Sequence, residues 1–348
     1  MALTLLRTAV ACALALLVMP SRSAAQAIAS EFDLTGGYST EGDTAASAAQ
    51  LRLFGDLSRN YRVNVEATWA SRSADTSDAF GAAYPYGGQV QLSEAYVERM
   101  FRPRGLLVGV RGGQYRSPFG IYTRSDYAYQ GFLRAPLLRY DDYWSVSNNF
   151  LERGVNVVAG TSRFQVEGSV GTPGDIGEAR RRGGISGTVR AQAYYKALVV
   201  GVSRISSEPY APARFATGRL NFTGVDGRFA HAGVIVRGEY VAGRPWARPE
   251  TQGWYLDAII HRRFMGPVTA VVRAERLRYA STRPFTYYDK TYTEWIANRQ
   301  TFGARVRLPH GFTAQAGVLR QSEALGHTSR TSLDFAVTYS IRRDLIAP

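Results

Sequence analysis

The residues of this chain that could do chemistry are charged side chains gathered in one stretch, residues 116–151. Those that we single out are Arg116, Arg124, Asp126, Arg134, Arg139, Asp141 and Asp142. Opposed charges facing each other across a narrow, water-filled passage orient ions and dipoles without breaking any bond. If this stretch narrows a passage, its arginines add positive potential there, and small anions are enriched. The alternative is a surface loop whose charges pair with one another or with anionic lipid.

Covalent and metal chemistry find little support in the sequence. The histidines are His231, His261, His310 and His327, and none has a partner at a spacing typical of a metal site. No G-x-S-x-G motif is present. The only cysteine is Cys12, so a thiolate metal site is excluded. We therefore expect no enzyme activity, no metal and no cofactor.

A second group of charged residues alternates with apolar residues in many short stretches. We assign to a water-facing wall Arg62, Glu66, Glu94, Glu98, Arg111, Arg305 and Arg307. Residues of the same pattern are Arg52, Arg190, Arg237, Glu239, Arg273 and Glu275, which brings the wall to eight basic and five acidic side chains. This balance favours anions mildly. The alternative is that these charges pair across strands and only hold the wall together, as the neighbours Arg237 and Glu239 suggest.

The elements that must position these charges are strands, because polar and apolar residues alternate with a period of two. The alternation predicts lipid-facing side chains at Trp69, Val166, Phe302, Val306, Phe335 and Tyr339. Sixteen strands are predicted, at about 31–39, 48–57, 60–70, 90–101, 105–115, 152–160, 163–172, 184–195, 197–206, 217–225, 228–241, 252–263, 267–279, 299–308, 311–321 and 331–342.

The connections between these strands alternate between short and long. Short ones include Val225-Asp226-Gly227-Arg228 and Pro309-His310-Gly311, and long ones include 116–151 and 280–298. Transmembrane β-barrels have short turns at one end and long loops at the other. The fold class expected is therefore all-β, a transmembrane antiparallel β-barrel of about sixteen strands with long external loops and short periplasmic turns.

The first 27 residues predict export. Arg7 precedes an apolar run from Thr8 to Met19, and Ala25-Gln26-Ala27 is a small-residue cleavage site, so we expect a signal peptide at 1–27 and a barrel at 28–348. The apolar run is too short to span a bilayer as a helix. The formal net charge of +14 is spread along the chain as arginine rather than clustered, which argues against nucleic acid as a partner.

One stretch resembles a known family. Glu94-Ala95-Tyr96-Val97-Glu98, followed by the run from Val110 to Gly120 that ends in Pro118-Phe119-Gly120, is similar to bacterial porins and most nearly to the phosphate-selective porin O and P family. The resemblance implies that the loop after this motif folds into the barrel. Phosphate-selective members carry a lysine ladder, whereas this chain has only Lys196 and Lys290, so phosphate selectivity is not implied.

Together these features predict an outer-membrane porin of a Gram-negative bacterium for passive diffusion of small hydrophilic solutes or ions, with a mild anion preference. The alternative is a structural or adhesive outer-membrane barrel with a plugged lumen. The partners expected are outer-membrane lipid, lipopolysaccharide and small solutes, including anions such as phosphate. Monomer and homotrimer are both left open.

Overall fold

The computed structural model describes residues 27–346 of the chain with several gaps. The described residues are 27–41, 43–58, 60–71, 88, 90–121, 134–139, 150–174, 184–208, 219–245, 249–287, 290–323 and 328–346. The predicted signal peptide lies outside them except for Ala27, the first residue of the first strand.

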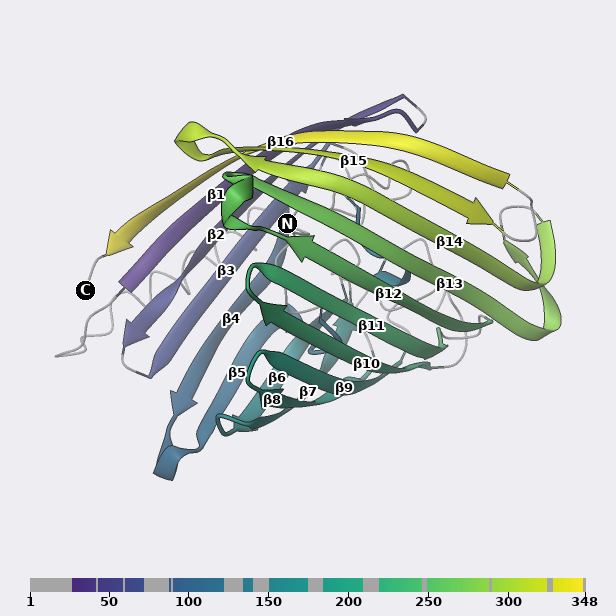
Figure 1. Cartoon of the computed structure of the whole chain (residues 1–348). Helices are drawn as coiled ribbons and strands as arrows, with labels where there is room; N and C mark the ends of the chain where they lie inside the picture. Colours follow the sequence, from purple (N-terminus) through teal and green to yellow (C-terminus); the bar gives the residue numbers. More distant parts are fainter. Residues whose placement is uncertain are drawn as a thin grey trace.

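Sixteen antiparallel strands form one closed barrel, as predicted (Figure 1). Their bounds are β1 Ala27–Ser39, β2 Thr44–Ser58, β3 Tyr61–Ala70, β4 Gln91–Phe101, β5 Leu107–Arg116, β6 Leu151–Gly160, β7 Phe164–Gly174, β8 Ser186–Tyr195, β9 Leu198–Ser207, β10 Leu220–His231, β11 Val234–Arg244, β12 Glu250–Ile260, β13 Val268–Tyr287, β14 Lys290–Arg307, β15 Phe312–Glu323 and β16 Thr328–Ile346. Each strand pairs with its sequence neighbours, and β1 pairs with β16 to close the sheet. Closure leaves no unpaired edge.

Burial along the strands has the predicted period of two. Outward-facing Val166, Phe302 and Phe335 are 39%, 55% and 47% exposed, whereas inward-facing side chains between them are buried. Trp69, Val306 and Tyr339 have the outward parity of their strands, and Glu66 and Arg305 have the inward parity. The alternation expected of strands with one outer and one inner face is therefore present in these residues. No helix among the described residues is long and apolar enough to cross a membrane.

We call the end of the barrel with the two described chain ends and the short connections the turn end, and the opposite end the loop end. Two turn-end connections pass through left-handed residue pairs, Arg104-Gly105 with φ of 50° and 82° and His310-Gly311 with φ of 59° and 81°. Two successive positive φ values suit a tight hairpin turn, because their twist matches that of the strands.

The predicted turn at Val225-Asp226-Gly227-Arg228 is wrong. β10 continues to His231, and the chain reverses at Ala232-Gly233, where φ is 47° and 77°. An Asp-Gly pair is a strong local turn signal. Here Asp226 is instead a buried inward-facing residue that accepts a hydrogen bond from Arg190 at 2.7 Å, and this interaction is not visible in the local sequence.

The predicted long connection at 280–298 is also wrong. β13 extends to Tyr287 and β14 begins at Lys290, so most of this segment is a long hairpin. Polar residues gave it the composition of a loop, but aromatic contacts hold the two strands together. Tyr279 stacks on Trp295 with ring centroids 5.0 Å apart, and Phe285 lies opposite Tyr292.

Candidate functional site

Parts of the connection between β5 and β6 lie inside the barrel. The described residues of this connection are 117–121, 134–139 and 150, and Ser117, Phe119, Leu137 and Arg139 are each 0% exposed. Their contacts are mainly with inward-facing side chains of the wall, together with Glu41 in the connection between β1 and β2. We call residues 134–139 the inner segment.

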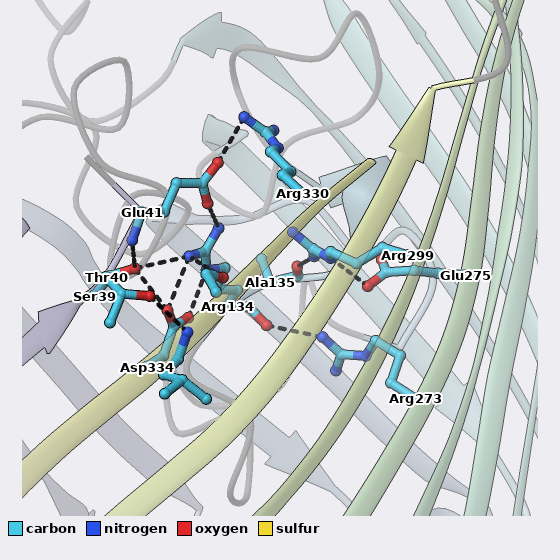
Figure 2. A network of polar contacts seen from close by, with 12 residues as sticks. Ser39, Thr40, Glu41, Arg134, Ala135, Arg273, Glu275, Arg299, Arg330 and Asp334 are labelled. Carbon is cyan, nitrogen blue, oxygen red and sulfur yellow. Dashed lines mark hydrogen bonds and ion pairs between the residues drawn. The ribbon is translucent and has the colours of Figure 1, made fainter. Parts of the chain in front are cut away.

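Arg134 fixes one end of the inner segment to the junction of β1 and β16. Its guanidinium donates to both carboxylate oxygens of Asp334, at 2.6 and 2.9 Å, and to Glu41 at 2.5 Å. It also donates to the hydroxyls of Ser39 and Ser332 at 3.0 and 3.2 Å. Figure 2 shows Ser39, Glu41 and Asp334 converging on this side chain. Arg134 is only 4% exposed, and Asp334 is 0% exposed.

The middle of the inner segment is held by its backbone. Arg273 of β13 donates to the carbonyl of Arg134 at 2.8 Å, and Arg299 of β14 donates to the carbonyl of Ala135 (Figure 2). Glu275 accepts from the amide of Leu137 at 2.5 Å and from Arg299 at 2.7 Å. Wall charges thus satisfy backbone groups that would otherwise be buried without partners.

Arg139 fixes the other end of the inner segment to β11. It forms a fully buried ion pair with Glu239 and donates to the carbonyl of Phe119 at 3.3 Å. The amide of Gly120 donates to Ser203 of β9 at 3.1 Å. A side chain at position 120 would collide with Glu239 and Arg139, and φ of 66° also favours glycine. The Pro118-Phe119-Gly120 motif therefore allows the strand end to pass beside this ion pair.

An apolar cluster inside the barrel completes this attachment. Its members on the connection are Phe119, Ala135, Leu137, Leu138 and Phe150. Its members on the wall include Ile205, Phe222, Val241, Tyr255, Leu277, Tyr279, Trp295 and Ala297, from β9 to β14. Burial of such side chains stabilises by about 1.5–3 kcal/mol each. One arc of the lumen is thus packed like a protein core.

The opposite arc of the wall is polar and brings together several predicted residues. Arg116 at the end of β5 lies 2.9 Å from Glu66 and 3.4 Å from Glu94. Arg111 lies 3.1 Å from Glu98. These pairs link β3, β4 and β5 across the inner face of the barrel.

The remaining predicted residues lie elsewhere. Arg62 pairs with Asp56 at 2.9 Å near the turn end, with about half of each side chain exposed. Arg305 and Arg307 also face inward near that end, on β14. Arg124, Asp126, Asp141 and Asp142 lie outside the described residues.

The charge balance of the wall differs from the sequence interpretation. The buried inward carboxylates that the sequence did not single out on the wall include Glu152, Glu167, Asp226, Asp257 and Asp334, and the buried Arg299 was missed as well. These five carboxylates more than cancel the predicted excess of three basic side chains. Arg237 and Glu239 do not pair with each other either: Arg237 donates to Asp257 at 3.1 Å, whereas Glu239 holds Arg139. Inward parity could have identified these carboxylates, but not their partners.

The described residues contain no group of three or more His, Cys, Asp or Glu side chains arranged to hold a metal ion.

Comparison with known proteins supports the architecture. No family model and no curated protein matches the chain. Among solved structures, the OmpF complex of Salmonella typhi with daunomycin has a TM-score of 0.61 and 9% identity, covering 90% of this chain and 97% of that one. An anion-selective porin from Comamonas acidovorans has a TM-score of 0.57 and 10% identity over 90% and 98%. A trimer form of the outer-membrane protein OmpT of Vibrio cholerae has a TM-score of 0.54 and 10% identity over 90% and 98%. At these identities the likeness shows the fold.

Proposed function

We propose that this protein is a passive pore for small hydrophilic solutes and ions in the outer membrane of a Gram-negative bacterium. The inner segment supports this proposal most directly, because it is attached to one arc of a closed barrel and leaves the polar arc of β3–β5 facing it. Solutes would pass between the inner segment and this arc. The proposal includes the cleaved signal peptide at 1–27, no enzymatic activity, and a homotrimer, the assembly named for one solved neighbour.

A planar-bilayer recording tests this function. We expect the refolded mature chain to give stable, ohmic single-channel steps, because a passive pore conducts without a gating cycle. A barrel that is correctly folded by circular dichroism but electrically silent would reject the proposal. It would favour the second candidate, a structural or adhesive barrel with a plugged lumen. The packed apolar cluster inside the barrel is the observation that favours this candidate.

We also propose a mild anion preference, supported chiefly by the turn end of the barrel. Described turn residues there include Arg102, Arg104, Arg163, Lys196 and Arg262, all exposed, and no acidic residue is described in these turns. Positive charge around one mouth raises the local concentration of anions. The arginines of the inner segment contribute less than predicted, because Arg134 and Arg139 are paired with carboxylates.

Neutralising the turn end should weaken this preference. In R102Q/R163Q/R262Q, the reversal potential under a KCl gradient should move toward the cation side. The shift should be larger near 0.1 M salt than near 1 M, because the screening length falls from about 10 Å to about 3 Å. The control R204Q/R276Q/R320Q removes three outward-facing arginines instead. An equal shift in both variants, or a cation-selective parent, would contradict the proposal.

A further inference from the structure

Glu152, the second residue of β6, is a fully buried carboxylate with no ion pair among the described residues. Its Oε1 atom accepts hydrogen bonds from the hydroxyls of Ser186, Thr188 and Ser117 at 2.7, 3.1 and 3.3 Å. Its Oε2 atom is buried and has no hydrogen-bond partner there. The hydroxyls of Ser117 and Thr188 lie 2.5 Å apart and share one hydrogen bond, so at most two hydroxyl hydrogens point to Glu152. The negative charge of Glu152 is therefore only partly compensated.

The described arginines on the inner face of the neighbouring strands are bound to other carboxylates. They are Arg111, Arg116 and Arg190, which lie 3.1, 2.9 and 2.7 Å from Glu98, Glu66 and Asp226, respectively. An ionised carboxylate that is buried without a cation is strongly unfavourable, and such groups in proteins are paired or bound to a metal ion. Glu152 therefore needs a cation that the described side chains of the wall do not supply.

The strand register gathers oxygen atoms around Glu152. Gly171 of β7 pairs with Gly154 of β6 on one side and with Ser186 of β8 on the other. Because neither glycine has a side chain, Glu152 reaches the hydroxyls of β8 across β7. Tyr115 of β5 pairs with Glu152, and its hydroxyl is also buried without a hydrogen-bond partner among the described residues. Two oxygen atoms without partners thus lie on paired residues, and both side chains are 0% exposed.

Oxygen ligands select a hard cation, because most transition metals prefer nitrogen and sulfur. Mg²⁺ usually keeps several of its waters, which a fully buried site does not accommodate. One carboxylate balances a single positive charge, and neutral oxygen atoms can replace the hydration shell of a monovalent ion. We propose that Glu152, with the hydroxyls of Ser117, Ser186 and Thr188, binds a dehydrated monovalent metal cation, Na⁺ or K⁺.

This cation would hold the neck of the connection between β5 and β6. Ser117 is the first residue after β5, and Glu152 is the second residue of β6. One ion therefore ties the point where the chain leaves the wall to the point where it returns. The inner segment belongs to this connection, so the cation helps to position it. The binding itself does not require the pore to conduct.

Thermal unfolding of the full mature barrel in non-ionic detergent tests this site. NaCl or KCl is replaced stepwise by choline chloride at constant ionic strength and pH, because choline is too large for a closed site. The unfolding midpoint, followed by circular dichroism, should rise by about 2 °C for each tenfold increase in Na⁺ or K⁺ once the site fills. E152Q should abolish this dependence. The matched control E94Q removes the same charge from the wall, leaves Arg116 paired with Glu66, and should keep it.

Several outcomes would overturn the site. If E152Q does not fold, the parent still decides the question: equal midpoints in NaCl, KCl and choline chloride would reject a bound cation. A dependence that survives in E152Q, or that E94Q also loses, would assign the effect to the general charge of the wall. A response to millimolar Ca²⁺ without a response to Na⁺ or K⁺ would reject a monovalent ion. T188V, which removes one hydroxyl ligand and keeps the carboxylate, should need about tenfold more cation for the same stabilisation.

Discussion

Replacing Arg134 with methionine should release the inner segment from the wall. The buried carboxylate of Asp334 would lose its cation, and breaking a buried pair by removing one partner costs about 3–5 kcal/mol. The released state would then become about 10² to 4 × 10³ times more populated. We expect the amides of Ala135, Leu137, Leu138 and Arg139 to exchange with deuterium much faster, and the single-channel conductance to rise or become unsteady.

Arg330 provides a matched control for this prediction. It pairs with the same Glu41, at 2.6 Å, but its side chain is 51% exposed. An exposed pair contributes about 0–1 kcal/mol, so R330M should leave both measurements nearly unchanged. The double variant R134M/D334L should recover part of the protection, because it removes the unpaired charge as well. Parent-like exchange in R134M would show that the apolar cluster alone holds the inner segment.

The barrel itself was predictable because its signal is local. In Tyr61–Ala70 the polar or apolar character of each residue indicates which face of the sheet it occupies. A closed barrel then requires only many such strands, joined by connections that alternate between short and long. The errors arose where a local signal competed with a distant contact. Asp226-Gly227 has the composition of a turn. Asp226 nevertheless lies in the middle of β10, where it accepts a hydrogen bond from Arg190 of β8.

The candidate site was predictable in its charges but not in its pairing. Arg134 and Arg139 were identified as loop arginines, but their carboxylates, Asp334 and Glu239, are 200 and 100 residues away in the chain. No spacing rule in a single sequence joins them. The same limitation explains the missed apolar anchors, Phe119 and Leu137, whose burial depends on side chains from β9 to β14. The sequence is therefore enough to assign a charged side chain to the inner or outer face of the barrel. The net electrostatic field around that side chain also depends on the residue with which it pairs, and the sequence does not identify that residue.

Arg116 is the residue at which the pairing of a charged side chain should have its largest effect on ion selectivity. Its guanidinium lies between Glu66 and Glu94, so the group of three carries one net negative charge. R116Q leaves two carboxylates facing each other on the polar arc. Low-dielectric walls concentrate such a field, and potentials of several kT can result. We expect the reversal potential under a KCl gradient to move strongly toward the cation side, more at low salt than at high salt.

Two further variants distinguish an effect of the electrostatic field from an effect of structural damage to the wall. E94Q leaves Arg116 paired one to one with Glu66 and should move the reversal potential the opposite way, toward anions. E66Q/R116Q/E94Q removes the whole group and should lie on the anion side of R116Q, because two carboxylates have gone. If R116Q and E94Q shift selectivity in the same direction, the change comes from a rearranged wall rather than from the field. If neither variant shifts it, the β3–β5 arc lies outside the permeation path, and the route proposed between this arc and the inner segment is wrong.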